Sequence, residues 1–193
     1  MYELEGQMGL IYFRLLEEKD FPQMLEWLNT DFVKQFWKEP YNTVDDIKAE
    51  YGGYVTGEQP TTGYIIMING VDVGYIQTYY YSDWQDDEEG MQYFQLLDAN
   101  KYSAGVDLFI GHRDYIHKGY GSPIMNAFIT EYIFSNLQTT SIIITPEPDN
   151  AIAIKVYERI GFKWYKTIIT SDGEQEYLMV LQKENFLAKI DTK

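Results

Sequence analysis

The segment 103–134 places an acid, a glycine-rich turn and a helix in direct succession. It begins with an apolar run that carries one acid, Asp107, and predicts a strand. A loop follows, then Gly119-Tyr120-Gly121-Ser122, then apolar residues at helical spacing from Ile124 to Ile133. The first N–H groups of a helix lack acceptors within the helix and lie at the positive end of its dipole, so this order can hold a phosphate-bearing anion. An ordinary Gly-x-Gly turn is the alternative.

The elements around this segment predict a mixed layout. Asp20 before Pro22 and Thr43 before Asp46 mark helix starts, with Gln23 completing a box-like pattern after Asp20. The Asn69-Gly70 pair joins two β-rich runs into a hairpin. Further on, the expected elements are a strand at 141–145, a helix closed by Gly161, and a hairpin of 162–170 with 176–181. We therefore expect an α+β fold with a mostly antiparallel central sheet flanked by helices.

Length and composition favour one domain. The chain has 193 residues, 45% of them hydrophobic and 17% aromatic, and no Pro-, Gly- or Ser-rich linker divides it. We expect a single domain over residues 1–193, with a core at about 10–182 and a frayed helical tail at 183–193.

The charge balance is strongly acidic. Thirty acids against 15 lysines and arginines give a formal net charge of −15. This charge repels nucleic acid and anionic membranes and attracts polycations, although a solubilising surface would look the same. The acids gather around Trp84 in the loop 82–89, which is either a solvated tip or a receptor for a multiply charged cation.

Residue types exclude several kinds of chemistry. The absence of cysteine rules out disulfides and thiolate nucleophiles, and two histidines, His112 and His117, argue against a metal centre or a histidine-based triad. The start of the chain has no signal-like pattern, and no segment reaches the length of a membrane span, which predicts a cytoplasmic protein without a membrane partner. A homodimer is compatible with the sequence.

The order of these motifs resembles the GNAT superfamily of acetyl-CoA-dependent N-acetyltransferases, and within it the aminoglycoside 6'-N-acetyltransferases. The resemblance extends from about Leu10 to Leu181. The residues that carry it are Glu26-Trp27-Leu28-Asn29, Gly74-Tyr75-Ile76-Gln77, Asp83-Trp84, Gly105-Val106-Asp107-Leu108-Phe109-Ile110-Gly111, Lys118-Gly119-Tyr120-Gly121, Pro146-Glu147-Pro148-Asp149-Asn150, Ala153-Ile154 and Tyr157-Glu158-Arg159-Ile160-Gly161-Phe162. Two positions depart from the usual pattern, Ile116 before the glycine turn and Leu108 after the strand acid.

The resemblance implies a GNAT-like sheet, acetyl-CoA as cofactor, and direct transfer of acetyl to an amine. Asp107 is the expected group that binds the substrate ammonium and accepts its proton, the alternative being a buried, hydrogen-bonded acid. Tyr157 is the expected acid for the leaving thiolate, the alternative being core packing. The expected cofactor-binding residues are Leu108, Phe109, Ile110, His117, Lys118, Gly119, Tyr120, Gly121, Ser122 and Asn150.

The expected partner is a cationic small-molecule amine. Aminoglycosides carry several ammonium groups, which suits the acidic loop and the net charge. The expected substrate-binding residues are Trp37, Asp83, Trp84, Asp86, Asp87, Glu88, Glu89 and Asp107, with Trp37 as core packing in the alternative. Three other functions stay open: acetylation of another amine or hydroxylamine (a siderophore precursor, a polyamine, a peptide N-terminus), a non-catalytic acyl-CoA-binding module, and a cation-binding module.

Overall fold

The computed structural model describes residues 2–3, 9–84, 102–170, 173 and 175–190. Contacts divide the chain into two compact units. The first unit is Met1–Thr78 with Asp107–Ala127, and the second is Tyr79–Val106 with Phe128–Lys193.

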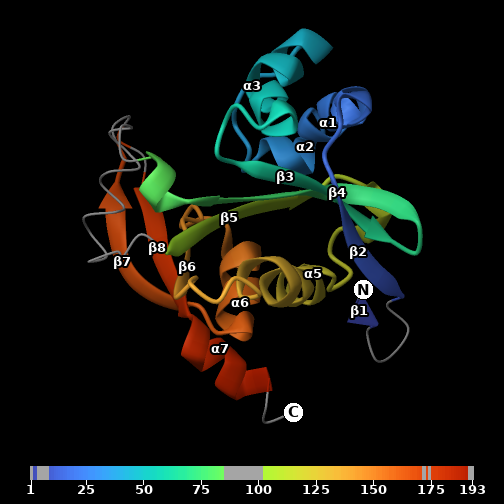
Figure 1. Cartoon of the computed structure of the whole chain (residues 1–193). Helices are drawn as coiled ribbons and strands as arrows, with labels where there is room; N and C mark the ends of the chain where they lie inside the picture. Colours follow the sequence, from blue (N-terminus) through green and yellow to red (C-terminus); the bar gives the residue numbers. More distant parts are fainter. Residues whose placement is uncertain (1, 4–8, 85–101, 171–172, 174, 191–193) are drawn as a thin grey trace. The chain divides into compact units, whose positions relative to one another are not determined.

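The first unit is a sheet with helices on both faces. Its strands have the order β1-β2-β3-β4-β5, and β1 to β4 pair antiparallel. Helices α1, α2 and α3 lie together over one face of β3 and β4, and α5 lies on the other face (Figure 1). The elements are β1 (Tyr2–Glu3), β2 (Leu10–Leu15), η1 (Glu18–Asp20), α1 (Phe21–Leu28), α2 (Asp31–Lys34), α3 (Val44–Thr56), β3 (Thr62–Ile68), β4 (Val71–Tyr80), β5 (Ser103–Ile110), η3 (Arg113–Tyr115) and α5 (Gly121–Phe128).

One core cluster of the first unit lies between the sheet and helices α1 to α3. Apolar residues at helical spacing in α1, among them Met24 and Leu28, are almost fully buried. They pack with Ile47 and Tyr51 of α3 and with Tyr75 of the sheet. Burying a large apolar side chain contributes roughly 1.5–3 kcal/mol, so this cluster fixes the helices on the sheet.

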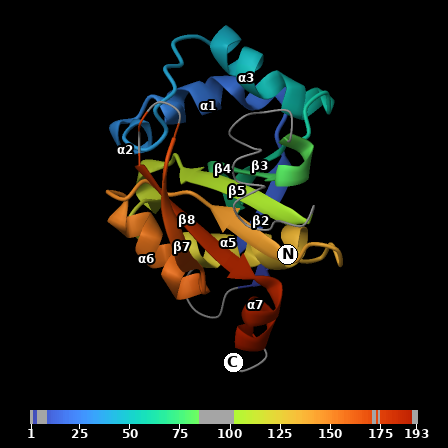
Figure 2. The same ribbon diagram turned by 90° about the vertical axis from the view of Figure 1, so that its left-hand side faces the viewer.

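The second unit takes the first half of β5 and continues as β5-β6-β8-β7. The β5/β6 pair is parallel, and the β6/β8 and β7/β8 pairs are antiparallel. Figure 2 shows α6 beside β7 and β8. The elements are η2 (Tyr81–Trp84), the π-helical turn η4 (Ile129–Ile133), β6 (Ser141–Ile144), α6 (Ala151–Ile160), β7 (Lys163–Ile169), β8 (Gln175–Gln182) and α7 (Lys183–Ile190).

These elements confirm the predicted α+β class and its mostly antiparallel sheet. The Asn69-Gly70 hairpin forms with positive φ at both residues, as its turn type requires. Helix α2 ends at Lys34, so Phe36 and Trp37 follow it. Residues Lys183–Ile190 of the expected tail form a regular helix, which Phe186 anchors with only 2% of its surface exposed.

One predicted helix start is wrong in its details. Helix α1 begins at Phe21, but the Asp20 carboxylate makes no cap to it. It pairs with the Arg14 guanidinium at 2.7 and 2.9 Å and accepts from the Glu17 N–H. Gln23 donates to Glu26, so the expected box does not form. The Asp20 carboxylate is buried and pairs with the partly buried Arg14 on β2, because burying an unpaired charge is unfavourable.

Candidate active site

Asp107 lies in the half of β5 that belongs to the first unit, and its side chain is half-buried. The Gln77 side-chain amide on β4 donates to Asp107 Oδ2 at 2.9 Å. The carboxylate is therefore hydrogen-bonded and partly open to solvent, and is not sealed in an apolar interior. Such a group can be ionised and can meet a cation from outside.

Aromatic rings surround the face of β5 that carries Asp107. Phe109 lies two residues along the strand, on the same face. Trp37 packs edge-on against the Phe109 ring at 5.1 Å and against the Tyr75 ring at 6.4 Å. Burial raises the pKa of Tyr54 on α3 above its usual range, and the charges of Glu50 and Asp107 raise it further. Phe109 and Tyr75 are buried, so the half-buried Trp37 and Tyr54 are the part of this aromatic wall that a cation can reach.

A close approach of β4 and β5 fixes the strand around Phe109. A side-chain Cβ at Gly74 would lie 2.2 Å from the Phe109 carbonyl oxygen, so only glycine fits there. The register of β3 with β4 skips Val73, the extra residue of a bulge. Its carbonyl accepts from the N–H groups of Gly111 at 2.9 Å and His112 at 3.0 Å. These contacts hold the end of β5 where the loop to α5 begins.

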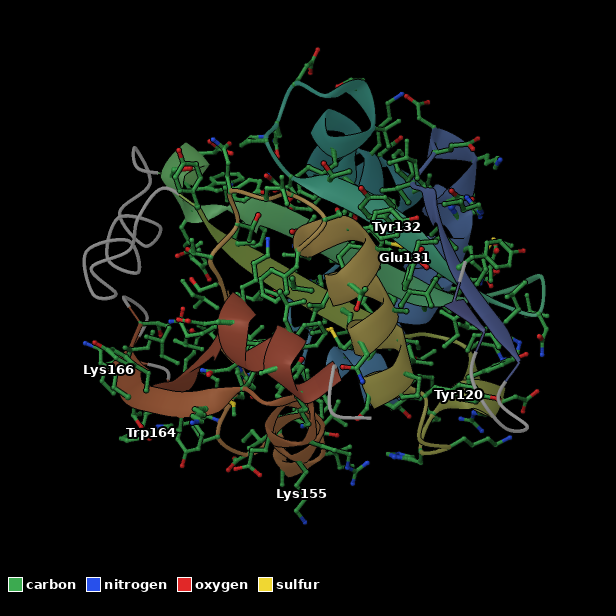
Figure 3. All side chains as sticks on the ribbon, turned by 60° about the horizontal axis from the view of Figure 1, so that its bottom comes forward. Tyr120, Glu131, Tyr132, Lys155, Trp164 and Lys166 are labelled. Atoms are coloured by element: carbon green, nitrogen blue, oxygen red, sulfur yellow. The ribbon has the colours of Figure 1, made fainter. Side chains whose placement is uncertain are left out.

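The turn before α5 is built for main-chain contacts. His117 has φ of 56° and Gly119 has φ of 84°, and residues 117–119 are exposed. A non-glycine residue at positive φ is strained, and such strain gathers at functional sites. The N–H groups of Gly121 and Ser122 open α5 and have no acceptor within the helix. Figure 3 labels Tyr120, the half-buried residue that leads into the helix.

Ser122 supports an anion at this turn. Its hydroxyl oxygen is buried and has no hydrogen-bond partner among the residues that the structure describes. A buried hydroxyl without a partner costs about 1–3 kcal/mol, so such a group commonly awaits a ligand. The orphaned hydroxyl and the N–H groups of the turn are all donors, which fits a phosphate.

Asn150 and Tyr157 both lie in the second unit, at the start and in the last turn of α6. The Asn150 side-chain oxygen accepts from the Ala153 N–H at 3.1 Å and caps α6. Its amide nitrogen is not used by the cap and stays available as a donor. Tyr157 is half-buried, with its ring centroid 5.7 Å from that of Phe162. Gly161 ends the helix as expected, but its φ of 126° lies outside the left-handed helical conformation expected for it.

The acetyltransferase (GNAT) domain family matches residues 17–170, which is most of the chain. The chain belongs to the GNAT acetyltransferase family. This confirms the family that the sequence resembles.

Known GNAT proteins similar to this chain extend the match. The aminoglycoside N(6')-acetyltransferase type 1 of Klebsiella pneumoniae is 29% identical over 88% of this chain and 82% of its own length. A crystal structure of aminoglycoside acetyltransferase AAC(6')-Ib in complex with coenzyme A has a TM-score of 0.78 and 27% identity, and the match covers 94% of this chain and 99% of that one. The same enzyme with coenzyme A and kanamycin gives a TM-score of 0.77 at the same identity and coverage.

The acidic loop of this GNAT chain is only partly described. Asp83 is exposed, and Trp84 is half-buried. The expected substrate-binding residues Asp86, Asp87, Glu88 and Glu89 lie outside the described residues.

The structure thus brings some of the predicted residues together within one unit. The first unit holds Trp37, Asp107 and the rest of β5 from Leu108 to Ile110, together with the turn 117–122. Leu108 and Ile110 are half-buried, while the Phe109 side chain is core, so any contact of Phe109 with a cofactor uses its main chain. The sequence pattern predicted no role for Gln77, although it stands in a motif that carries the resemblance.

A pocket of about 220 Å³ lies elsewhere, on α6, β7 and β8 of the second unit. It is lined by Ile154, Glu158, Trp164, Thr167, Tyr177 and Met179, so no predicted site residue contributes to it. Figure 3 shows Trp164 on β7, together with Lys166, and Lys155 on α6. In the part of the chain that the structure describes, no group of acids and histidines could hold a metal ion. No helix within the described ranges could cross a membrane.

Proposed function

We propose that this GNAT protein transfers an acetyl group from acetyl-CoA to the 6'-amine of aminoglycosides, by direct transfer in a ternary complex. The observation that carries the proposal is the match of 94% of this chain to an acetyltransferase whose structure contains coenzyme A and kanamycin. The half-buried Asp107 beside an aromatic wall is consistent with a site for an ammonium group.

The cofactor's diphosphate fits the turn before α5. The donors are the N–H groups of residues 117–122 and the Ser122 hydroxyl. Because most of these donors belong to the main chain, Ile116 at the departing position does not disturb them. Bound acetyl-CoA supplies the acetyl group as a thioester. We further propose that Leu108, Phe109 and Ile110 hold its pantetheine arm and that a main-chain N–H near Leu108 or Phe109 stabilises the developing oxyanion.

Asp107 acts on the acceptor. Its carboxylate attracts the substrate ammonium and takes the proton that the amine must lose before attack, directly or through water. A partly exposed carboxylate that accepts a hydrogen bond from Gln77 can be ionised and can be reached from outside, which is what this role needs.

Two residues of α6 act on the leaving group. Tyr157 donates its phenolic proton to the thiolate of coenzyme A, whose basicity is similar. Asn150 keeps its oxygen in the helix cap and offers its amide N–H to the pantetheine arm. Both roles remain predictions from the sequence.

The acceptor is recognised by charge and by aromatic surface. Trp37, whose ring packs on Phe109, forms part of the wall for the sugar amine. Asp83 and Trp84, with the acids at 86, 87, 88 and 89, attract the other ammonium groups, and the net charge of −15 steers a polycation to them. A single domain, a cytoplasmic location and a homodimer also remain predictions.

The test is release of coenzyme A from acetyl-CoA in the presence of kanamycin. We expect turnover by the purified chain, and a fall in kcat/KM of at least about a hundredfold in Asp107→Asn, the typical loss when a general base is removed. Asn keeps the size of the side chain, so unchanged thermal unfolding controls for the fold.

Other acceptors sharpen the result. Spermidine, a hydroxylamine and a peptide N-terminus are assayed beside kanamycin, and the highest kcat/KM identifies the acceptor class. Binding of acetyl-CoA without turnover of any amine would contradict the proposed function and favour an acyl-CoA-binding module. Full activity in Asp107→Asn would remove Asp107 from the mechanism.

A further inference from the structure

A chain of two hydrogen bonds leads from the core of the first unit to Asp107. The Tyr75 hydroxyl donates to the side-chain oxygen of Gln77 at 2.9 Å, and the Gln77 amide nitrogen donates to Asp107 Oδ2 at 2.9 Å. Tyr75 and Gln77 are two residues apart on β4, so their side chains lie on one face of the strand.

Tyr75 is a fixed donor. Its side chain has 0% of its surface exposed, and burial holds the pKa of Tyr75 well above its ordinary value. The phenol therefore stays neutral and requires an acceptor, which the Gln77 oxygen provides. Gly63, the register partner of Gln77 on β3, leaves room for this hydroxyl, because a Cβ there would lie 2.6 Å from it.

The buried phenol determines which way the Gln77 amide faces. If the amide were turned over, the Tyr75 proton would lose its acceptor and the Gln77 oxygen would face the Asp107 carboxylate oxygen. The first change leaves a buried donor unpaired, and the second brings two acceptors together, so both are unfavourable. With the amide held as it is, an N–H is always directed at Asp107. A hydrogen bond donated to a carboxylate favours its ionised form.

We propose that Gln77 is a positioning residue for Asp107, held in one orientation by Tyr75 above Gly63, and that it keeps the Asp107 carboxylate ionised and aimed at the acceptor amine. The proposal rests on the proposed function, in which Asp107 accepts the proton of the amine. Gln77 itself does not touch the reacting atoms in this scheme.

The described groups around Asp107 include two phenols. The phenols of Tyr54 on α3 and Tyr75 on β4 interact electrostatically with Asp107, and Glu50 on α3 interacts with both phenols. A neutral donor at Gln77 stabilises the ionised carboxylate and, unlike a lysine, adds no charge that would repel a cationic acceptor.

The first experiment measures titration of Asp107 without any substrate. Carboxyl ¹³C NMR of aspartate-labelled protein follows Asp107, assigned by loss of its resonance in Asp107→Asn. We expect its titration midpoint to move up by about one pH unit in Gln77→Met, which removes the donor. In Gln77→Glu the move is larger, because Tyr75 holds one oxygen of the new carboxylate and the other faces Asp107. Midpoints that coincide with the wild type in both variants would overturn the proposal.

The second experiment measures kinetics. We expect the acid limb of the kcat/KM profile with kanamycin to move to higher pH in both variants, and kcat in Gln77→Met to fall about tenfold with KM for acetyl-CoA unchanged. Gln182→Met, an exposed glutamine on β8, is the matched control and keeps the wild-type profile. A profile that falls in height without moving would indicate a merely structural role and would also count against the proposal.

The two experiments separate two kinds of failure. If the wild type acetylates no amine, the proposed function fails, while the NMR titration still decides whether Gln77 controls Asp107. Tyr75→Phe removes the hydroxyl that orients Gln77, and Gly63→Ala displaces it. Both variants keep Gln77, so each should raise the titration midpoint of Asp107 by less than Gln77→Met does. Thermal unfolding of each variant shows whether it folds. If Tyr75→Phe or Gly63→Ala does not fold, the titration of Asp107 in Gln77→Met tests the proposal alone.

Discussion

Helices α3 and α5 both start in the first unit, and their first turns are built in opposite ways. At α3, the Thr43 hydroxyl accepts from the Asp46 N–H at 3.2 Å, and the Asp46 carboxylate accepts from the N–H groups of Asn42 at 2.8 Å and Thr43 at 2.9 Å. At α5, the Ser122 hydroxyl caps nothing and has no partner within the described ranges, and positive φ at Gly119 precedes it.

The difference separates stability from binding. A capped helix start satisfies its own N–H groups and stabilises the fold by about 1 kcal/mol. An open start gives up that stabilisation and keeps its donors for an anion. If this comparison is correct, changes at the start of α5 should alter cofactor affinity with little effect on stability. Changes at the start of α3 should alter stability with little effect on cofactor affinity.

The largest effect is expected at Gly119. A Cβ at φ of 84° is disfavoured by about 1–2 kcal/mol, so Gly119→Ala should change the turn and its main-chain donors. We expect KM for acetyl-CoA to rise about tenfold, which corresponds to about 1.4 kcal/mol. The stabilisation that acetyl-CoA gives to the wild type by mass action, measured as a rise in Tm, should shrink accordingly.

Gly57 provides the control for this variant. It ends α3 at φ of 76°, and a Cβ added there would meet nothing within 4 Å, so Gly57→Ala has a similar backbone cost away from the turn. We expect a lower Tm and an unchanged KM for acetyl-CoA. Equal rises in KM in both variants would mean that general destabilisation, and not the turn, governs cofactor affinity.

The next effect pairs Ser122→Ala with Thr43→Ala. Removing the unpartnered Ser122 hydroxyl should leave the free energy of unfolding unchanged or slightly higher, and should raise KM for acetyl-CoA about fivefold by loss of one hydrogen bond to phosphate. Removing the Thr43 cap should lower the free energy of unfolding by about 1 kcal/mol and leave KM unchanged. Denaturant unfolding measures the free energy of unfolding of each variant, and steady-state kinetics measure its KM for acetyl-CoA. A result with the two effects interchanged would contradict the comparison.

The sequence predicted the starts of α1 and α3 with different success. The Thr43 and Asp46 pattern is local, so the capping box could be predicted and is confirmed. The hairpin at Asn69-Gly70 is local in the same sense. The local pattern at Asp20 also predicts a helix cap, but the Asp20 carboxylate pairs with Arg14 instead. Arg14 also pairs with Asp72, which is 58 residues away from it along the chain. No local pattern contains that contact.

The candidate site shows the same limit. Asp107 could be singled out because one acid in an apolar strand is conspicuous, and the glycine turn because its residue types are. The link from Tyr75 through Gln77 to Asp107 joins two strands across 30 residues, and it depends on Gly63 leaving room for a hydroxyl. An alternating strand such as β4 shows which side chains share a face, but not which atom of a neighbouring strand they meet.

The smallest effect concerns the charge in the α3 capping box. Hydrogen bonds from the main-chain N–H groups of Asn42 and Thr43 lower the pKa of Asp46. A carboxyl with a lowered pKa in the folded state contributes stability that is complete above its unfolded value, near 3.9, and is lost as the pH falls through its folded value. We therefore expect Asp46→Asn to lower Tm slightly at neutral pH, and the difference from the wild type to narrow as the pH falls below about 4.

A difference in Tm that stays constant down to acid pH would mean that the capping box acts through geometry and not through the Asp46 charge. A change in KM for acetyl-CoA at neutral pH would show that the two helix starts are coupled.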